Sequence, residues 1–231
     1  MPSVHALWHY PVKSLGGCSA DTLAFDARGA VGDRGWAVIT AAGKIGSGKN
    51  TRRFERVEGL LKLASGNAPD GTPTILLPDG RALPVDADAT ASALSEVLGR
   101  PVTLAPERNV RHFDDDGVHL LSLASVDWVS DGVGEASVDA RRFRANILIG
   151  GTADGLPEDA WVGRELVLGS VRLRVNSRAE RCVMVNSEQR ELPSNQAILR
   201  HLGRHNDACL GVYASVVTPG SVHVGDELRV V

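Results

Sequence analysis

The chain has 231 residues, of which 43% are hydrophobic and 23% charged, as in a globular protein with one large or two small cores. Its formal net charge of -3 argues against a protein that coats nucleic acid, and no apolar run approaches the roughly 18 residues needed to span a bilayer. The three cysteines form no CxxC pair, which excludes a disulfide framework, zinc ribbons and thioredoxin-like motifs. We therefore expect a cytoplasmic protein without a secretory signal, in which a functional cysteine works as a single thiolate.

In the first half of the chain, glycines and prolines separate short segments that are typical of strands. The stretch TILLPDGRALPV predicts a hairpin that turns at Pro78-Asp79-Gly80. One helix is expected at 88–98, with acidic residues at its start and Gly99 at its end. Further strands are expected at residues 4–12, 21–25 and 35–40.

A segment of mixed charge, residues 105–118, is expected to link two modules, with domains at 1–106 and 107–231. Beyond it, a strand leads into a short helix at HLLSLASVDWVSDG, and a second helix is expected at 194–203, capped by Ser194. Strands are expected at 141–150, 164–175 and 182–185, and in the closing stretch around Pro219-Gly220. Many short strands and few helices favour a mainly β fold of two β-rich, barrel-like modules.

Two stretches resemble ligand sites without meeting their requirements. GKIGSGKNT, residues 43–51, nearly matches a phosphate-binding loop, but Asn50 stands where a magnesium-binding hydroxyl is required and the surroundings indicate strands. We interpret it as a solvated hairpin. The acidic triplet at 114–116, between His112 and His119, lacks the spacing of a calcium loop, and a solvated linker is the preferred interpretation.

Other residue types suit anion binding. Lys13 and Ser14 follow a strand and precede two glycines, where an ammonium and a hydroxyl could hold an anionic oxygen. A simple surface strand end explains them as well. Arg34, in the turn GDRGW, suits bidentate phosphate contact or a structural ion pair with Asp33.

The stretch RRFRANILI adds a second basic group. In a strand, Arg142, Arg144 and Asn146 would lie on one face, because side chains alternate. The like charges repel one another, and either a bound anion or exposure to solvent would resolve that conflict.

The segments YPVKS, GDRGW, RRFRANILI, an Arg-Cys strand and LGVYASVVTPGSVHVGDEL occur here in one order. In this order they resemble the MOSC family, named for the C-terminal domain of molybdenum cofactor sulfurases, preceded by that family's N-terminal β-barrel domain. The resemblance covers residues 1–231. Within the family, the chain is most similar to reductases of amidoximes and other N-hydroxylated compounds.

The resemblance implies a molybdenum cofactor between the two modules, its metal held by a pterin dithiolene, oxo groups and the Cys182 thiolate of the Arg181-Cys182 pair. It also carries an expectation of pyridoxal phosphate binding. The pterin or its phosphate would be held from the first half by Lys13, Ser14 and Arg34, and from the second by Ser122, Ser125, Arg144 and Asn146.

Cys182 suits this role chemically, because a thiolate continues the soft donor set of the dithiolene and nearby Arg178 and Arg181 favour the ionised form. The alternative is a buried, inert strand cysteine, which is how we interpret Cys18 and Cys209. Glu180 departs from the pattern of the reductases, which have a small hydroxyl residue there. Its carboxylate would oppose a further anion or act as a catalytic proton donor.

Three functions fit these features. The first is an oxidoreductase that reduces N-hydroxylated or N-oxide small molecules. Because the chain has no iron–sulfur cysteine set and no flavin or dinucleotide motif, electrons must come from a separate protein of the ferredoxin or flavin reductase type. The second is a sulfur carrier with a persulfide on Cys182. The third is a non-catalytic carrier of the molybdenum cofactor.

Overall fold

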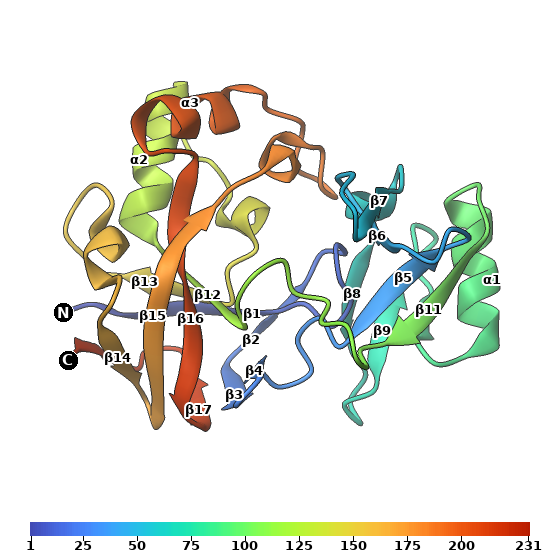
Figure 1. Ribbon diagram of the computed structural model, residues 1–231, viewed down its shortest axis with the longest axis horizontal. Helices are drawn as coiled ribbons and strands as arrows, with labels where there is room; N and C mark the ends of the chain where they lie inside the picture. Colours follow the sequence, from blue (N-terminus) through green and yellow to red (C-terminus); the bar gives the residue numbers. More distant parts are fainter.

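The larger of two β-rich bodies is built on an eight-stranded sheet in the computed structural model, which describes residues 1–231 (Figure 1). Only β12 and β13 pair in parallel within this sheet. Alternating burial along the strands places Val171, Leu173 and Val175 in a core of 19 residues. In spatial order the strands are β18 (Leu228–Val230), β14 (Glu165–Leu168), β15 (Val171–Glu180), β16 (Cys209–Thr218), β12 (Val118–Ser122), β13 (Ile147–Gly150), β1 (Ser3–His9) and β2 (Cys18–Ala20).

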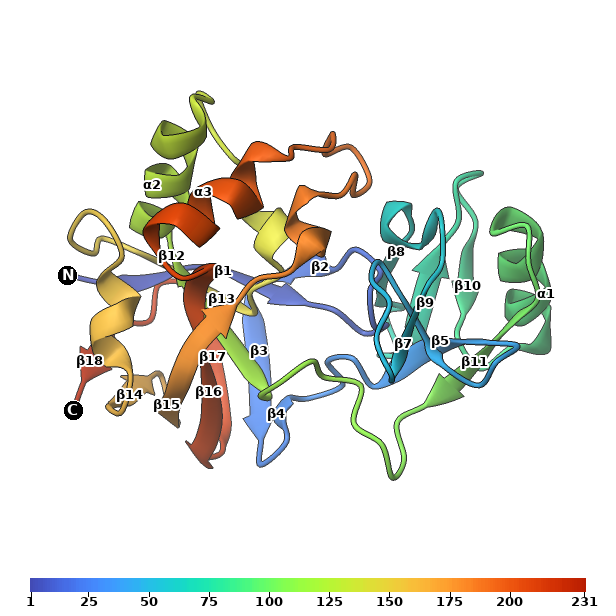
Figure 2. The ribbon, with the colours of Figure 1, turned by 45° about the horizontal axis from the view of Figure 1, so that its top comes forward.

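Two helices, α2 (Leu123–Val133) and α3 (Ala197–His205), pack together over the larger body and bury a second apolar cluster (Figure 2). A small sheet of β3 (Thr22–Asp26), β4 (Gly29–Ala30) and β17 (Gly220–His223) completes the core of the eight-stranded sheet. The 3-10 helices η2 (Ala140–Phe143), η3 (Pro157–Trp161) and η4 (Val183–Asn186) lie in its connections.

The smaller body has its own core of 11 buried residues. It contains two short sheets, one helix, α1 (Asp88–Val97), and one 3-10 helix, η1 (Leu60–Lys62). One sheet has the order β11 (Val102–Pro106), β5 (Trp36–Thr40), β6 (Ile45–Ser47), β7 (Phe54–Arg56). The other has the order β10 (Ala82–Pro84), β9 (Pro73–Leu76), β8 (Ala64–Asn67). No helix is both long and apolar enough to cross a membrane.

The chain passes between the bodies twice. Residues 1–30 supply β1 to β4 of the larger body, and residues 107–117 lead back to it from the smaller one (Figure 1). The loop after β1 is tied to the smaller body by backbone hydrogen bonds from Lys13 to Trp36 (2.8 Å) and from Gly16 to Leu63 (2.9 Å). This loop therefore forms one side of the junction.

The prediction of a mainly β chain of two β-rich modules with few helices is confirmed. The hairpin at β9 and β10, the helix at 88–97 and the hairpin at β14 and β15 all form where the sequence indicates. Gly99 ends the helix in the left-handed conformation that glycine adopts readily (φ 63°).

Three local predictions are wrong. Residues 141–146 do not form a strand, because Asp139 caps η2 and Arg144 turns the chain with φ 60°; the strand begins at Ile147. Residues 183–186 form η4 rather than a strand. The last helix begins at Ala197 without a cap from Ser194, and it runs through Gly203 to His205.

Candidate active site at the junction of the two bodies

A cavity of about 90 Å³ lies between the two bodies, and most of the residues predicted from the sequence line it. Six of the lining side chains are cationic and two are carboxylates, so positive charge dominates its wall. The smaller body and its loops contribute Lys13, Ser14, Arg34 and Lys49; the linker contributes Asp114; the larger body contributes His119, Arg142, Phe143, Arg144, Glu180, Arg181, Cys182, Met184, Val185 and Tyr213.

Three of these residues hold a strained backbone. Ser14, Arg34 and Arg144 have φ values of 69°, 52° and 60°, a left-handed region that costs a residue other than glycine roughly 1–2 kcal/mol. Surrounding hydrogen bonds impose it: the Arg34 amide donates to the carbonyl of Tyr10 (2.7 Å), and the Tyr10 amide donates to Asp33 (2.7 Å). Such strain gathers at functional sites, where it fixes side-chain direction.

Two guanidinium groups meet over one aromatic ring. Arg34 and Arg144 lie 5.0 and 4.5 Å from the ring centroid of Tyr10, and Arg34 donates to the backbone carbonyl of Arg144 (3.2 Å). The Asp33 carboxylate forms an ion pair with Arg34, as the alternative interpretation from the sequence expected. Arg144 has no acidic partner; it donates to the carbonyl of Leu15 (2.6 Å).

Three nitrogens of the cavity's arginines are buried without any partner: Nε of Arg142, Nη2 of Arg144 and Nε of Arg181. Burial, and then repulsion from Arg34, lowers the pKa of Arg144 to about 10. A buried donor without an acceptor is costly. An anion bound in the cavity would supply acceptors and would also reduce the repulsion between Arg34 and Arg144.

Asp114 bridges two lysines at one side of the cavity. Its carboxylate forms ion pairs with Lys13 and with Lys49, the latter at 2.7 Å. Burial would raise the pKa of Asp114, but the two ammonium groups outweigh it and hold this pKa well below its usual range. Burial lowers the pKa of Lys13 to about 8, although Asp114 partly opposes the shift.

Cys182 is half-buried and lines the cavity at the point where β15 ends and η4 begins. Its neighbour Arg181 also lines the cavity, and its guanidinium donates to the carbonyl of Phe143 (2.7 Å). The His119 ring nitrogen Nε2 lies 3.5 Å from Nη1 of Arg181. Burial, and then the positive charge of Arg181, keeps the pKa of the His119 imidazole well below its usual value. Cys182 thus faces a cationic space and is not enclosed by aliphatic side chains.

The structure places Ser122, Ser125 and Asn146 outside this cavity. Ser122 caps α2 by accepting from the Ser125 amide (3.0 Å), and its hydroxyl donates to buried Glu158 (2.6 Å). Asn146 donates to the carbonyl of Trp8 (3.3 Å) and lines a smaller adjoining space. The contacts of these residues join strands and a helix of the larger body, and the cofactor-binding role that the sequence suggests for them stays a prediction.

Two arginines also differ from the sequence-based picture. The side chain of Arg142 is buried and donates to the carbonyls of Val185 (3.1 Å), Ser187 (2.9 Å) and Pro193 (2.7 Å), because the chain is a turn here and not a strand. Arg178 binds Asn206 and Asp207 and does not line the cavity, so Arg181 is the nearer guanidinium.

Sequence reasoning missed Lys49 and Asp114, which line the cavity and pair there. They belong to the two stretches interpreted as a solvated hairpin and a solvated linker. Lys49 is half-buried, whereas Asp114 is exposed to solvent while it pairs with both lysines. A loop leading to β7, and no helix, follows Lys49. The signal was present in the complementary charges of the two segments, but only the fold brings them together.

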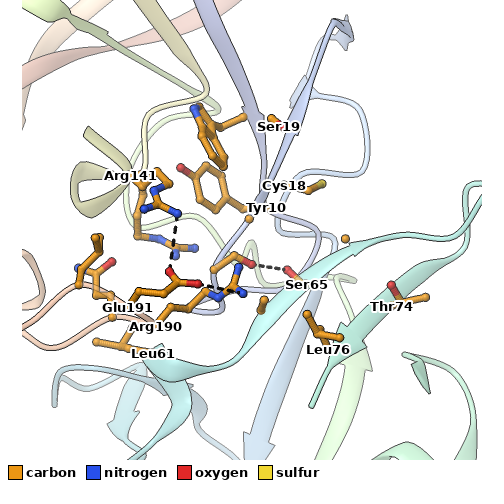
Figure 3. Close-up of a pocket in the computed structure, with 18 of the residues that line it drawn as sticks. Tyr10, Cys18, Ser19, Leu61, Ser65, Thr74, Leu76, Arg141, Arg190 and Glu191 are labelled. Carbon is orange, nitrogen blue, oxygen red and sulfur yellow. Dashed lines mark hydrogen bonds and ion pairs between the residues drawn. The ribbon is translucent and has the colours of Figure 1, made fainter. Parts of the chain in front are cut away.

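A second cavity, of about 450 Å³, shares Arg144 with the first (Figure 3). Trp8 and Tyr10 give it an aromatic wall, and Arg141, Arg190 and Glu191 form ion pairs at its edge. Glycine is required at position 17, since a Cβ would meet the His9 carbonyl at 2.4 Å and the Tyr10 ring at 2.6 Å.

Comparison with known proteins gives a family for both halves. The model of the MOSC N-terminal beta barrel domain matches residues 1–104, and that of the MOSC domain matches residues 107–229. The solved structure of the YUAD protein from Bacillus subtilis is similar over 100% of this chain and 96% of its own (17% identity, TM-score 0.56). YiiM from Escherichia coli is 11% identical over 100% of this chain and 68% of its own (TM-score 0.46). No curated protein matches the sequence.

Proposed function

The chain belongs to the MOSC family, whose domains are associated with molybdenum cofactor binding, and we propose that it binds this cofactor at the junction of its two bodies. The proposal further assigns it the reduction of N-hydroxylated or N-oxide small molecules. The observation that carries it is the position of Cys182 in a cavity where buried guanidinium nitrogens lack partners.

The residues present fit the group. Cys182 offers the soft thiolate donor that molybdenum takes beside a dithiolene. Arg144 and Arg181 offer unpartnered donors to anionic oxygens, with Lys13 and Arg34 adding positive charge. The 90 Å³ space adjoins the 450 Å³ cavity, where Trp8 and Tyr10 offer an aromatic wall for a fused-ring heterocycle.

The bound molybdenum would supply the two-electron chemistry at the N–O bond. Overall, an N–OH group takes up two electrons and two protons to become N–H, and water is released. Glu180 is exposed and lines the cavity, so its carboxyl group is placed to carry protons from solvent. Lys13, Arg34 and Arg144 would hold the anionic groups and fix their orientation. Hydrogen bonds hold the backbones of Lys13 and Arg34 and tie the side chain of Arg144 to the Leu15 carbonyl.

The electrons would come from a separate donor protein of the ferredoxin or flavin reductase type. No group of three or more His, Cys, Asp or Glu side chains is placed to hold a metal ion. Neither the comparisons nor the site supports the expected binding of pyridoxal phosphate, which is not part of the proposal.

Metal analysis of protein made in a molybdenum-replete host tests the proposal. We expect about one molybdenum per chain in wild type and less than a tenth of that in Cys182→Ala, because the thiolate is the protein's ligand to the metal. Cys209→Ala is the matched control, since Cys209 is also half-buried but lies outside the cavity. Equal, negligible molybdenum in wild type and Cys182→Ala would overturn the proposal.

Turnover separates this function from the two alternatives. Loaded wild type should reduce benzamidoxime with a reduced dye as electron source. Stoichiometric molybdenum without any turnover would favour a cofactor carrier. A persulfide on Cys182, detected by mass spectrometry in protein without molybdenum, would favour sulfur transfer.

A further inference from the structure

A groove on the smaller body, separate from both cavities of the junction, combines an apolar floor with a basic rim. It measures about 620 Å³ and is open to solvent along the linker between the bodies. We call it the basic groove; it is lined by Ile39, Gly43, Lys44, Ile45, Arg52, Arg53, Leu104, Ala105, Pro106, Arg108, Asn109, Val110 and His112.

The floor exists because one face of a sheet is only partly covered. Alternation along β5 sends Val38 into the main core of the smaller body and Ile39 to the opposite face. There Ile39 packs on a cluster of only three buried residues, among them Ile45 and Phe54. Val110 of the linker lies beside this face and is 59% exposed.

Positive side chains dominate the rim; the Glu107 carboxylate beside it accepts from the backbone amide of His112 (2.7 Å). Lys44, Arg52 and Arg108 are exposed and take part in no ion pair, and no carboxylate lines the groove. Arg53 donates to the carbonyl of Phe113 (3.1 Å), while its Nε is buried without a partner. Since the whole chain carries a net charge of -3, this concentration of positive charge is local.

We propose that the basic groove is the docking surface for an acidic segment of a partner protein. Unpaired cations around the half-buried Ile39 and the exposed Val110 complement a segment in which carboxylates flank apolar residues. A nucleic acid would leave Ile39 and Val110 without a partner and would be repelled by the overall charge.

The groove adjoins the cavity of the junction through one aromatic ring. Arg53 of the groove lies 5.1 Å from the centroid of Phe54, and the ammonium groups of Lys13 and Lys49 in the cavity lie 5.0 and 5.2 Å from it. His112 of the groove contacts the backbone oxygen of Arg34 (3.0 Å). Resting on the proposed function, the inference assigns this surface to the protein that donates the electrons.

Charge reversal tests the docking. Arg52→Glu/Arg108→Glu removes two positive charges from the rim and adds two negative ones. Arg164→Glu/Arg229→Glu makes the same change at exposed, unpaired arginines of the larger body. The probe is a fluorescein-labelled peptide in which pairs of glutamates alternate with leucines, followed by anisotropy at low and high salt.

We expect the groove variant to bind this peptide at least about tenfold more weakly than wild type, and the control variant to bind like wild type. If added salt weakens peptide binding by wild type but not by the groove variant, the peptide contacts the charged rim. Equal loss in both variants, no binding by wild type, or tighter binding of an RNA oligonucleotide of the same length would overturn the proposal.

A second measurement addresses the donor. With a purified acidic plant-type ferredoxin and its reductase, the groove variant should lose at least about tenfold in turnover, while turnover with reduced dye stays at the wild-type level. Equal turnover of wild type and groove variant with ferredoxin would overturn the assignment to the donor. If the chain holds no molybdenum, the proposed function fails, but peptide binding still decides the docking surface.

Discussion

The core of the eight-stranded sheet and the cavity at the junction follow opposite rules. In the core, regular strands bury apolar side chains such as Leu120, Val175 and Val212 with nearly complete exclusion of water. At the cavity, charged groups lie close to one another, and three residues have a left-handed backbone conformation. The first region stabilises the fold. The second lowers its stability, because like charges are held close together at a place that suits an anion.

Truncation of the core should have the largest effect on folding. Leu120→Ala, at a position with no exposed surface, is expected to lower the free energy of unfolding by about 2–5 kcal/mol. Val217→Ala, at an exposed position, should change it by less than about 0.5 kcal/mol. Urea unfolding measures both. Similarly small changes in the two variants would contradict the stabilising role of the buried core.

Ser122→Ala should have an intermediate effect, because it removes the cap of α2 and a hydrogen bond to buried Glu158. We expect a loss of about 1–3 kcal/mol with unchanged molybdenum content per folded chain. Ser137→Ala, at an exposed serine, is the control. A variant of Ser122 that keeps its stability but loses molybdenum would restore the role expected from the sequence.

Arg144→Gln should barely change the stability of the ligand-free protein. Glutamine is too short to keep the hydrogen bond from Nη1 to the Leu15 carbonyl, but the repulsion between Arg144 and Arg34 disappears. The two effects oppose each other, so the net change should stay within about 1 kcal/mol. Molybdenum content should fall at least about tenfold, since an orphaned donor is lost. Arg142→Gln should instead destabilise the fold, because Arg142 ties three carbonyls together. Calorimetry and metal analysis separate the two arginines.

The smallest effect is a titration. Nuclear magnetic resonance of ¹³C-labelled lysine should show Lys13 titrating at about 8, below the ordinary 10.5, and Lys49 above 10.5. Because folding lowers the pKa of Lys13, its unfavourable contribution to stability is present below pH 8 and disappears as the pH rises to 10.5. Asp114→Asn should lower the pKa of both lysines. A Lys13 signal that titrates near 10.5 in wild type would contradict its burial beside Arg34.

Much of the fold, and several residues that line the junction cavity, could be predicted from the sequence. Alternating apolar residues and turn signals specified most strands, and the ordered motifs pointed to Lys13, Ser14, Arg34, Arg144 and Cys182, all of which line one cavity. The stretch 141–146 was misjudged, because its strand-like composition is overridden by the Asp139 cap and a left-handed turn at Arg144. Asn146 lies beside the cavity, in a smaller space that shares Arg34 and Asp114 with it, because the strand begins only at Ile147.

The sequence by itself determined where apolar and polar residues alternate, where glycine allows a turn, and which residue types are available for anion and metal binding. The tertiary structure alone decided which charges meet. Lys49 and Asp114 are 65 positions apart, and their ion pair of 2.7 Å exists only because the loop after β6 and the linker converge at the junction. Local patterns follow from nearest neighbours along the chain, whereas the electrostatics of a buried site depend on groups that only folding brings together.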